Sequence, residues 1–306
     1  MNILVSGASG LIGATLVPFL TTGGHTVTRL VRAAPKPGTA EIQWNPQTGS
    51  INIAGLEGMA AVVHLAGENI AAARWTAEQK ARIRESRVRG TQLLSEALAQ
   101  LSQPPQVFMC ASAIGYYGDR GDELLQEESP AGSGFLAEVC RAWEAATEPA
   151  VQKGIRTVQL RIGVVLSPAG GALARMLLPF KMGVGGVIGD GKQYMSWIGL
   201  DDVVGAIQHV LVTDSLRGAV NAVAPHPVTN RDFTKTLGRV LGRPTLLPMP
   251  AFAARLAFGE MADELLLAST RVEPSRLVST GYVFRYPELD AALRHLLGKE
   301  EAQLRP

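Results

Sequence analysis

The sequence is poor in cysteine: a chain of 306 residues contains only Cys110 and Cys140. Two isolated cysteines in apolar surroundings exclude a disulfide framework and favour a reducing compartment, so we expect a cytoplasmic protein. None of the five histidines lies at a spacing that is typical of metal ligands, and no metal site is expected.

An excess of one charge is missing as well, because 29 basic residues stand against 27 acidic ones. Without a basic block, neither a nucleic-acid partner nor a membrane partner is expected. No run of 18 apolar residues is free of charges or helix breakers, so no transmembrane helix is predicted. The opening "MNILVSG" lacks a basic segment before its apolar residues, and we expect no signal peptide.

What the chain does have is a regular alternation of short apolar runs with helical segments. The runs are rich in β-branched residues and nearly continuous, as in strands that are covered on both faces. This pattern predicts an α/β protein with a Rossmann-type, doubly wound parallel sheet. The expected strands are 2–7, 26–32, 60–67, 106–112 and 157–166, and the expected helices between them are 11–22, 76–100 and 134–151.

The pattern changes after residue 166, where a glycine-rich stretch begins. From residue 225 on, short helical segments are separated by prolines. We therefore predict an NADP-binding Rossmann domain over 1–166 and a smaller, mostly helical substrate-binding lobe over 167–306. Residues 200–224 are expected to return to the sheet.

A glycine-rich loop follows the first expected strand, with Gly7, Gly10 and Gly13 between strand and helix. The first glycine permits a tight turn, the second lets a pyrophosphate approach the backbone, and the third lets helix and strand pack closely. The start of the helix supplies free amides to the anion. The loop predicts a dinucleotide site; a plain strand–helix turn is the alternative.

Acidic residues are absent before Glu41, although an NAD site usually has a carboxylate at the end of the second strand. Arg29, Arg32 and Lys36 occupy this region instead. A guanidinium suits the 2′-phosphate of NADP in charge and geometry, so NADP(H) is predicted as the cofactor, with Arg32 as its contact. The alternative is that these side chains are merely solvated.

Several motifs in combination resemble a known family. The glycine loop, "HLAGENI" (64–70) and "ASAIGYYGD" (111–119) are similar to those of the extended short-chain dehydrogenase/reductases, which include nucleoside-diphosphate-sugar epimerases. "WIGLDD" (197–202) and the stretch 224–244 further resemble the atypical subgroup called epimerase family proteins, which has an extra C-terminal domain. The resemblance implies these cofactor-binding residues: Gly7, Ser9, Gly10, Leu11, Ile12, Gly13, Arg32, Leu65, Ala66, Gly67, Arg82, Arg87 and Val165.

The family's catalytic pair, Tyr-x-x-x-Lys, does not occur anywhere in the sequence. Aligned on Glu144, the positions of the pair fall on Leu136 and Cys140, which cannot do its acid–base work. The helix 134–151 is therefore interpreted as an apolar wall. Ser112 and Tyr116 remain as candidate catalytic residues, with a bound water or mere packing of the tyrosine as alternatives.

Two functions stay open at this point. The first is an NADP-dependent oxidoreductase or epimerase with an atypical active site, acting on an unknown small molecule such as a nucleotide sugar. The second is a catalytically silent NADP(H)-binding regulatory or interaction protein. By family analogy, the helices 76–100 and 134–151 are candidates for a homodimer interface.

Overall fold

The computed structural model describes residues 1–299, which form two compact units. The first unit comprises Met1–Tyr116, Ser133–Arg161 and Val204–Val220. The second comprises Tyr117–Gly132, Ile162–Val203 and the chain from Asn221 on. The sequence predicts a single boundary at residue 166, whereas each unit is made of several chain segments. Residues 117–132 and 162–166 belong to the second unit, and 204–220 belong to the first.

An eight-stranded sheet lies mainly in the first unit, in the order β12-β8-β6-β5-β1-β2-β3-β4. Strand β1 pairs in parallel with β2 and with β5, and β2–β3 and β5–β6 are also parallel, whereas β4 is antiparallel to β3. The predicted doubly wound fold is thereby confirmed. Its strands are β1 (Asn2–Ser6), β2 (Thr26–Val31), β3 (Glu41–Asn45), β4 (Ser50–Ile51), β5 (Ala61–His64), β6 (Val107–Ala113), β8 (Arg156–Ile162) and β12 (Gly218–Ala222).

The order of the strands reverses at β1, because the chain builds β2 and β3 on one side of it and β5 and β6 on the other. In open α/β sheets, ligands bind beyond the carboxyl ends of the strands at such a switch point. All four residues of β5 are buried, as are the last four of β1, which explains their unbroken apolar runs.

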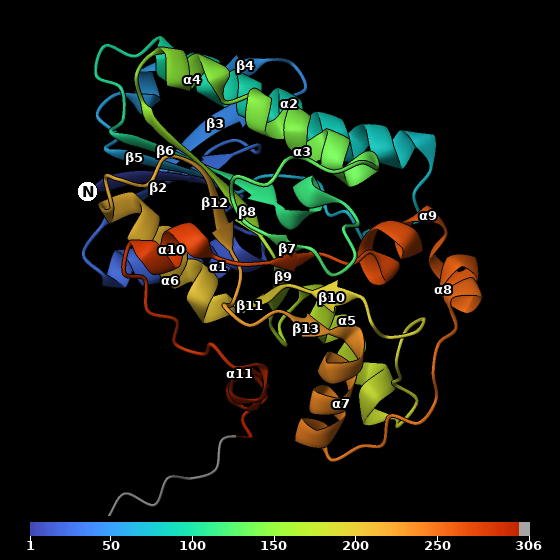
Figure 1. Ribbon diagram of the computed structural model, residues 1–306. Helices are drawn as coiled ribbons and strands as arrows, with labels where there is room; N and C mark the ends of the chain where they lie inside the picture. Colours follow the sequence, from blue (N-terminus) through green and yellow to red (C-terminus); the bar gives the residue numbers. More distant parts are fainter. Residues whose placement is uncertain (300–306) are drawn as a thin grey trace, which may run out of the picture. The chain divides into compact units, whose positions relative to one another are not determined.

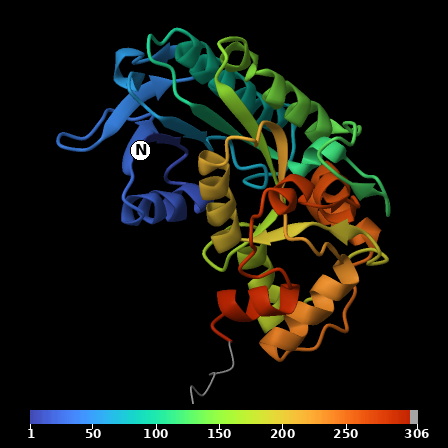
Figure 2. The ribbon, with the colours of Figure 1, turned by 60° about the vertical axis from the view of Figure 1, so that its left-hand side comes forward.

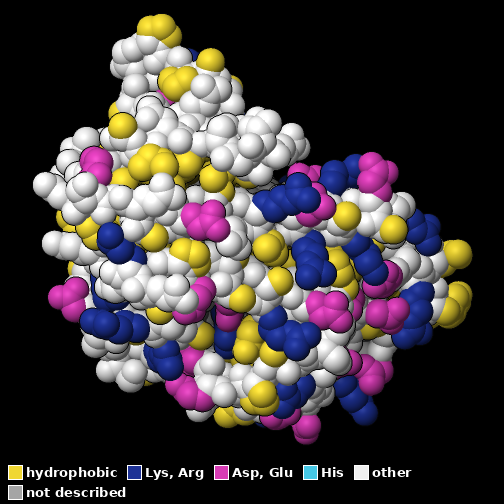
Figure 3. Space-filling view, turned by 90° about the horizontal axis from the view of Figure 1, so that it is seen from above, with side chains coloured by type: hydrophobic (Ala, Val, Ile, Leu, Met, Phe, Trp, Pro, Cys, Tyr) yellow, Lys and Arg dark blue, Asp and Glu magenta, His cyan; other side chains and the backbone are white. Residues whose placement is uncertain are grey.

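Helices cover both faces of this sheet (Figures 1 and 2). On one face lie α2 (Ala77–Ala99), α3 (Phe135–Ala145) and α4 (Glu148–Gln152), and on the other α1 (Leu11–Thr22) and α6 (Leu200–Val212). The predicted single helix over 134–151 is wrong, because it breaks into α3 and α4 just before Pro149, which lies in the first turn of α4. Seen from the side of α2 and α3, Lys and Arg side chains are interspersed with Asp and Glu (Figure 3).

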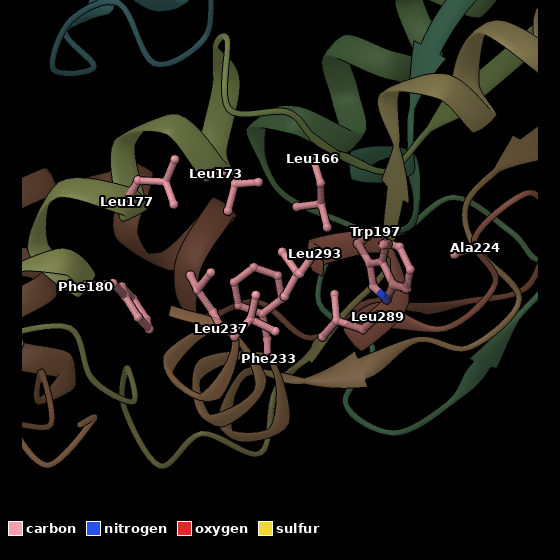
Figure 4. Close-up of a cluster of buried hydrophobic side chains, with 12 residues drawn as sticks. Leu166, Leu173, Leu177, Phe180, Trp197, Ala224, Phe233, Leu237, Leu289 and Leu293 are labelled. Carbon is pink, nitrogen blue, oxygen red and sulfur yellow. The ribbon is translucent and has the colours of Figure 1, made fainter. Parts of the chain in front are cut away.

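The second unit is built from three two-stranded pairs and a set of short helices. Its core lies between α5, α7 and α11, where Trp197 and Phe233 are completely or almost completely buried among leucines (Figure 4). Helices α7 and α11 lie side by side. The elements are β7 (Leu124–Leu125) with β14 (Arg271–Val272), β9 (Val164–Leu166) with β11 (Trp197–Gly199), β10 (Tyr194–Met195) with β13 (Val228–Thr229), α5 (Gly171–Lys181), α7 (Asn230–Leu241), α8 (Ala251–Phe258), α9 (Glu260–Ala262), η3 (Asp263–Leu267), α10 (Ser275–Ser279) and α11 (Leu289–Leu296).

Candidate functional site

The loop between β1 and α1 is closed so tightly that side chains are excluded from it. Gly7 has a φ of 69°, and its carbonyl oxygen accepts the amide of Gly10 at 3.0 Å. A Cβ on Gly13 would lie 2.2 Å from this same oxygen and 2.7 Å from the Cα of Ala8. Because these neighbours are backbone atoms, the loop accommodates only glycine at residue 13.

The start of α1 is open to an anion. Gly10 is its N-cap residue, no side chain caps the helix, and its first turn contains no acidic residue. Leu11 and Ile12 begin the helix, and Ser9 is exposed just before it. The free amides and the positive end of the helix dipole therefore suit a phosphate, and the missing side chain of Gly10, where a Cβ would meet only the Gly7 carbonyl oxygen, lets it approach the backbone.

A second loop, which follows β5, lies directly against the first. A Cβ on Gly7 would be 2.7 Å from the carbonyl carbon of Leu65. The hydroxyl oxygen of Ser6 accepts the amides of Leu65 at 3.2 Å and Ala66 at 3.3 Å. The ends of β1 and β5, the two strands at the switch point, are thus joined through one serine.

His64 completes this junction. Its Nδ1 lies 2.6 Å from Ser6 Oγ, and because that oxygen already accepts two amides, its own hydrogen is available for Nδ1. The imidazole is fully buried between Trp44 and Phe108, and burial lowers the pKa of His64 to about 4. The ring is therefore neutral at physiological pH and serves as an acceptor for the serine.

Arg32 follows β2 at the same edge of the sheet as Gly7, since Ser6 of β1 is paired with Leu30 of β2. Its side chain is exposed and has no hydrogen bond or ion pair within residues 1–299. Arg29 differs, because it is paired in register with Glu41. The pKa of Glu41 is lowered by the amide of Lys36 and by the charges of Lys36 and Arg29. Arg32 is thus the arginine of this region that has no carboxylate partner.

Of the two arginines predicted on the helix after β5, only Arg87 lies at the loops. Its side chain runs against Gly67, where a Cβ would be 3.4 Å from the guanidinium carbon, and it stacks on Trp143 at 5.0 Å. Arg82 instead binds Glu78 at 2.9 Å and Gln79, within its own helix. Val165 lies on β9 in the second unit, whereas the other predicted cofactor residues all belong to the first.

The candidate catalytic residues lie in a buried polar cluster at the end of β6. Ser112 is 3% exposed, and its hydroxyl donates to Oε1 of Glu144 at 2.7 Å. Arg161 donates to both oxygens of Glu144, through Nε and Nη2, each at 2.8 Å. The guanidinium carbon of Arg161 lies 3.4 Å from the ring centroid of Tyr116. One ion pair thus links both candidate residues.

The positions of the missing catalytic pair are filled by apolar packing. Leu136 and Cys140 are buried on α3, and burial raises the pKa of the Cys140 thiol to about 12. The expected wall on α3 exists, but the same helix also carries Glu144, which the sequence analysis used only as an alignment mark. Ser6, His64 and Arg161 were also missed, because their partners are distant in sequence. Tyr117 donates its hydroxyl to Oδ1 of Asn221 at 2.7 Å.

Comparisons with known proteins agree with this geometry. The model of the NAD dependent epimerase/dehydratase family matches residues 3–222. The chain belongs to this family. A second model, a domain of unknown function (DUF1731), matches residues 249–296, in agreement with the extra C-terminal domain that the sequence resemblance implied.

Two relatives match along almost their whole length. Epimerase family protein Mb2239 of Mycobacterium bovis is 46% identical over 95% of this chain and 96% of its own, and epimerase family protein SDR39U1 of Homo sapiens is 38% identical over 97% and 100%. A crystal structure of human SDR39U1 (isoform 2) with NADPH covers 98% of this chain and 100% of its own, with a TM-score of 0.90 and 36% identity. The structure of a nucleoside-diphosphate sugar epimerase from Corynebacterium glutamicum is 40% identical, with a TM-score of 0.82, over 99% of this chain and 59% of its own.

Two other features are absent from residues 1–299. No group of three or more His, Cys, Asp or Glu side chains is arranged to hold a metal ion in this part of the chain. Over the same range, no helix is long and apolar enough to cross a membrane.

Proposed function

We propose that this protein binds NADP(H) at the β1–α1 loop and uses it to oxidise or reduce a small hydroxyl- or carbonyl-bearing substrate, such as a nucleotide sugar. The observation that carries the proposal is the junction of the β1 and β5 loops beside an arginine that has no carboxylate partner. The NADPH in the crystal structure of human SDR39U1 supports the choice of cofactor. The name of the related nucleoside-diphosphate sugar epimerase supports the class of substrate.

The residues present fit this cofactor. The close turn at Gly7 and Gly13, the missing side chain at Gly10 and the uncapped amides of α1 together suit a pyrophosphate. The guanidinium of Arg32 would hold the 2′-phosphate through charge-assisted hydrogen bonds, and Leu65, Ala66 and Gly67 would border the adenosine half. When bound, NADP(H) accepts or supplies a hydride at its nicotinamide.

The proton that accompanies the hydride needs a group in this chain, and Ser112 is the best placed. Its hydrogen is held by Oε1 of Glu144, so its oxygen can accept the proton of a substrate hydroxyl while its own proton passes to Glu144. In the direction of reduction the same proton moves back to the substrate. Tyr116 is the second candidate, since its ring is fixed against Arg161. Ser112 and Glu144 would together replace the missing tyrosine and lysine.

A second function, a silent NADP(H)-binding regulatory or interaction protein, is favoured by one specific observation. Both oxygens of Glu144 accept hydrogen bonds from Arg161, so the carboxylate is already engaged in a structural ion pair. Leu136 and Cys140 offer no other acid or base at neutral pH.

Two steps test the proposal. Titration with NADPH and NADH first establishes binding and preference. Incubation with UDP-sugars and with small alcohols and ketones then tests turnover, followed by nicotinamide absorbance for net redox and by NMR for epimerisation. We expect turnover that falls at least about tenfold in Ser112→Ala and Glu144→Gln while NADPH affinity stays within about twofold. If binding is intact, no substrate is turned over and a protein partner distinguishes NADP⁺ from NADPH, the second function holds. If neither cofactor binds, both functions are wrong.

A further inference from the structure

Most of the large hydrophobic side chains that are exposed lie in two short stretches of the second unit, 178–184 and 246–258. Leu246 is 82% exposed, Leu256 77% and Phe252 72%. Side chains of this kind are normally scattered singly over the surface of a soluble protein, and a contiguous group marks an interaction site. We call this group the apolar surface: Leu178, Met182, Leu246, Leu247, Phe252 and Leu256.

Backbone contacts hold the two stretches against each other. A Cβ on Gly186 would lie 1.7 Å from the carbonyl oxygen of Leu247, and one on Gly183 would touch Pro244. Met249 donates its amide to Val187 at 2.8 Å, and its carbonyl accepts the amide of Gly189 at 2.9 Å. The segment after α7 therefore runs along the end of α5 and continues directly into α8 (Figure 1). Phe252 and Leu256 are four residues apart, so they project from one face of α8.

Charges of opposite sign border the two ends of the apolar surface. Lys181 and Arg243 are exposed at the α5 end, where the neighbouring residues 178–189 and 243–250 contain no acid. The α8 end adjoins Glu260 and Asp263, and Asp263 binds Arg255 of α8 at 2.8 Å. An apolar centre with a polar rim that carries both signs is the anatomy of a protein–protein interface, whereas binding to an anionic membrane would need cations along the whole rim.

We propose that the apolar surface is the interface between two copies of this chain, related by a twofold axis that lies in the interface, at a right angle to the line from the α5 end to the α8 end. Such an axis brings the α5 end of each copy over the α8 end of the other. Lys181 and Arg243 of one copy then face the acidic residues beside α8 of its partner, twice by symmetry. The apolar side chains of both copies meet in the middle and leave water. This arrangement does not depend on the proposed function, because no residue of the cofactor loops takes part.

Family analogy predicts a different interface, on the helices 76–100 and 134–151. The outer face of α2 and α3 is covered by side chains of both charges (Figure 3). It contains, within residues 77–99 and 135–145, no large hydrophobic side chain that is exposed. That interface stays a prediction, and the experiment must separate the two surfaces.

Sedimentation equilibrium of the full chain over a range of concentrations measures self-association. Phe252→Ser with Leu256→Ser should weaken the dimer by about 30-fold or more, because central aromatic and aliphatic contacts dominate such interfaces. Lys181→Glu and Glu260→Lys should each weaken it severalfold, and the double variant should restore it, since the two charges exchange places. Val283→Ser, which removes an exposed side chain elsewhere in the same unit, is the control. Circular dichroism shows that each variant is folded.

Three results would overturn the proposal: a wild-type chain that stays monomeric at all concentrations, a dimer that survives the loss of Phe252 and Leu256, or a dimer that is broken instead by Glu85→Arg on α2. Failure to restore the dimer by exchanging the two charges would refute the twofold arrangement.

Discussion

Acid should destabilise this protein through one buried side chain, His64. Its imidazole is neutral in the folded protein because burial lowers its pKa from 6.5 to about 4. The unfolded chain takes up a proton at about 6.5, so between these two pH values the unfolded state binds more protons than the folded state. The free energy of unfolding is therefore expected to fall as the pH is lowered through this window. The contribution of His64 is complete above it and lost below it.

The size of the effect follows from the two pKa values. Their difference corresponds to about 3 kcal/mol, and it needs little correction for solvent screening because the ring is fully buried. Urea unfolding, followed by tryptophan fluorescence at several pH values from 7 downward, measures it. Variants are compared by how steeply the free energy of unfolding changes with pH, because every substitution of a buried side chain also lowers this free energy at neutral pH.

His64→Asn should remove this slope, because asparagine keeps an acceptor near Nδ1 but does not titrate. His25→Asn is the matched control, since His25 lies on the surface beside the amino terminus, and it should keep the slope of the wild type. An unchanged slope in His64→Asn would refute the reasoning and place the acid sensitivity in another group.

Further substitutions test the loops and the polar cluster. Gly13→Ala should cost about 2 kcal/mol in urea unfolding and weaken NADPH binding at least about tenfold, because its methyl group meets backbone atoms at 2.2 Å; Gly199→Ala, which meets nothing within 4 Å, should change neither. Ser6→Ala should cost about 2 kcal/mol by leaving two amides and His64 without their partner, and a neutral result would mean that the serine does not join the strands. Glu144→Ala should cost about 3 kcal/mol, because it leaves the guanidinium of Arg161 buried without a counter-charge, and Glu144→Leu combined with Arg161→Met should recover most of it. A double variant as unstable as the single one would contradict that explanation.

The local elements of this fold could be predicted from the sequence where the pattern was long and periodic. Helix α1 has the bounds expected from the sequence, and α2 is one residue shorter at each end than the expected 76–100. Strands β3 and β4 were missed, because in "EIQWN" only Ile42 and Trp44 point into the core, and two apolar residues do not make a recognisable pattern.

Two of the expected elements are longer than the observed ones, because a single residue interrupts each of them. The strand expected over 157–166 ends at Ile162 and resumes at Val164. A Cβ on Gly163 would lie 2.7 Å from the carbonyl oxygen of Ser196, so this glycine marks a close approach of backbones. The helix expected over 134–151 breaks before Pro149, a residue whose effect the sequence analysis overlooked.

In the candidate site, too, residues with a local sequence signal could be predicted and residues without one could not. The glycine loop and Arg32 were visible because their signal is local: a spacing of glycines and an absence of acids. Glu144 and Arg161 gave no such signal, since Glu144 meets Ser112 only after folding, across 32 residues of chain, and Arg161 meets Glu144 across 17. A buried ion pair between distant residues has no pattern along the sequence, and only the structure shows that the helix taken for a wall also carries a charge.

A titration with NADPH and NADH, followed by nicotinamide fluorescence, tests the cofactor site most directly. Wild type should bind NADPH more tightly than NADH. Arg32→Ala should weaken NADPH binding by about 10- to 100-fold, the effect of one charge-assisted contact, and leave NADH within about twofold. Arg29→Ala, which removes an arginine that lies opposite Glu41 in the β2–β3 pairing, should change NADPH affinity only slightly. Equal affinity for both cofactors, or an equal loss of both in Arg32→Ala, would contradict a 2′-phosphate site at Arg32.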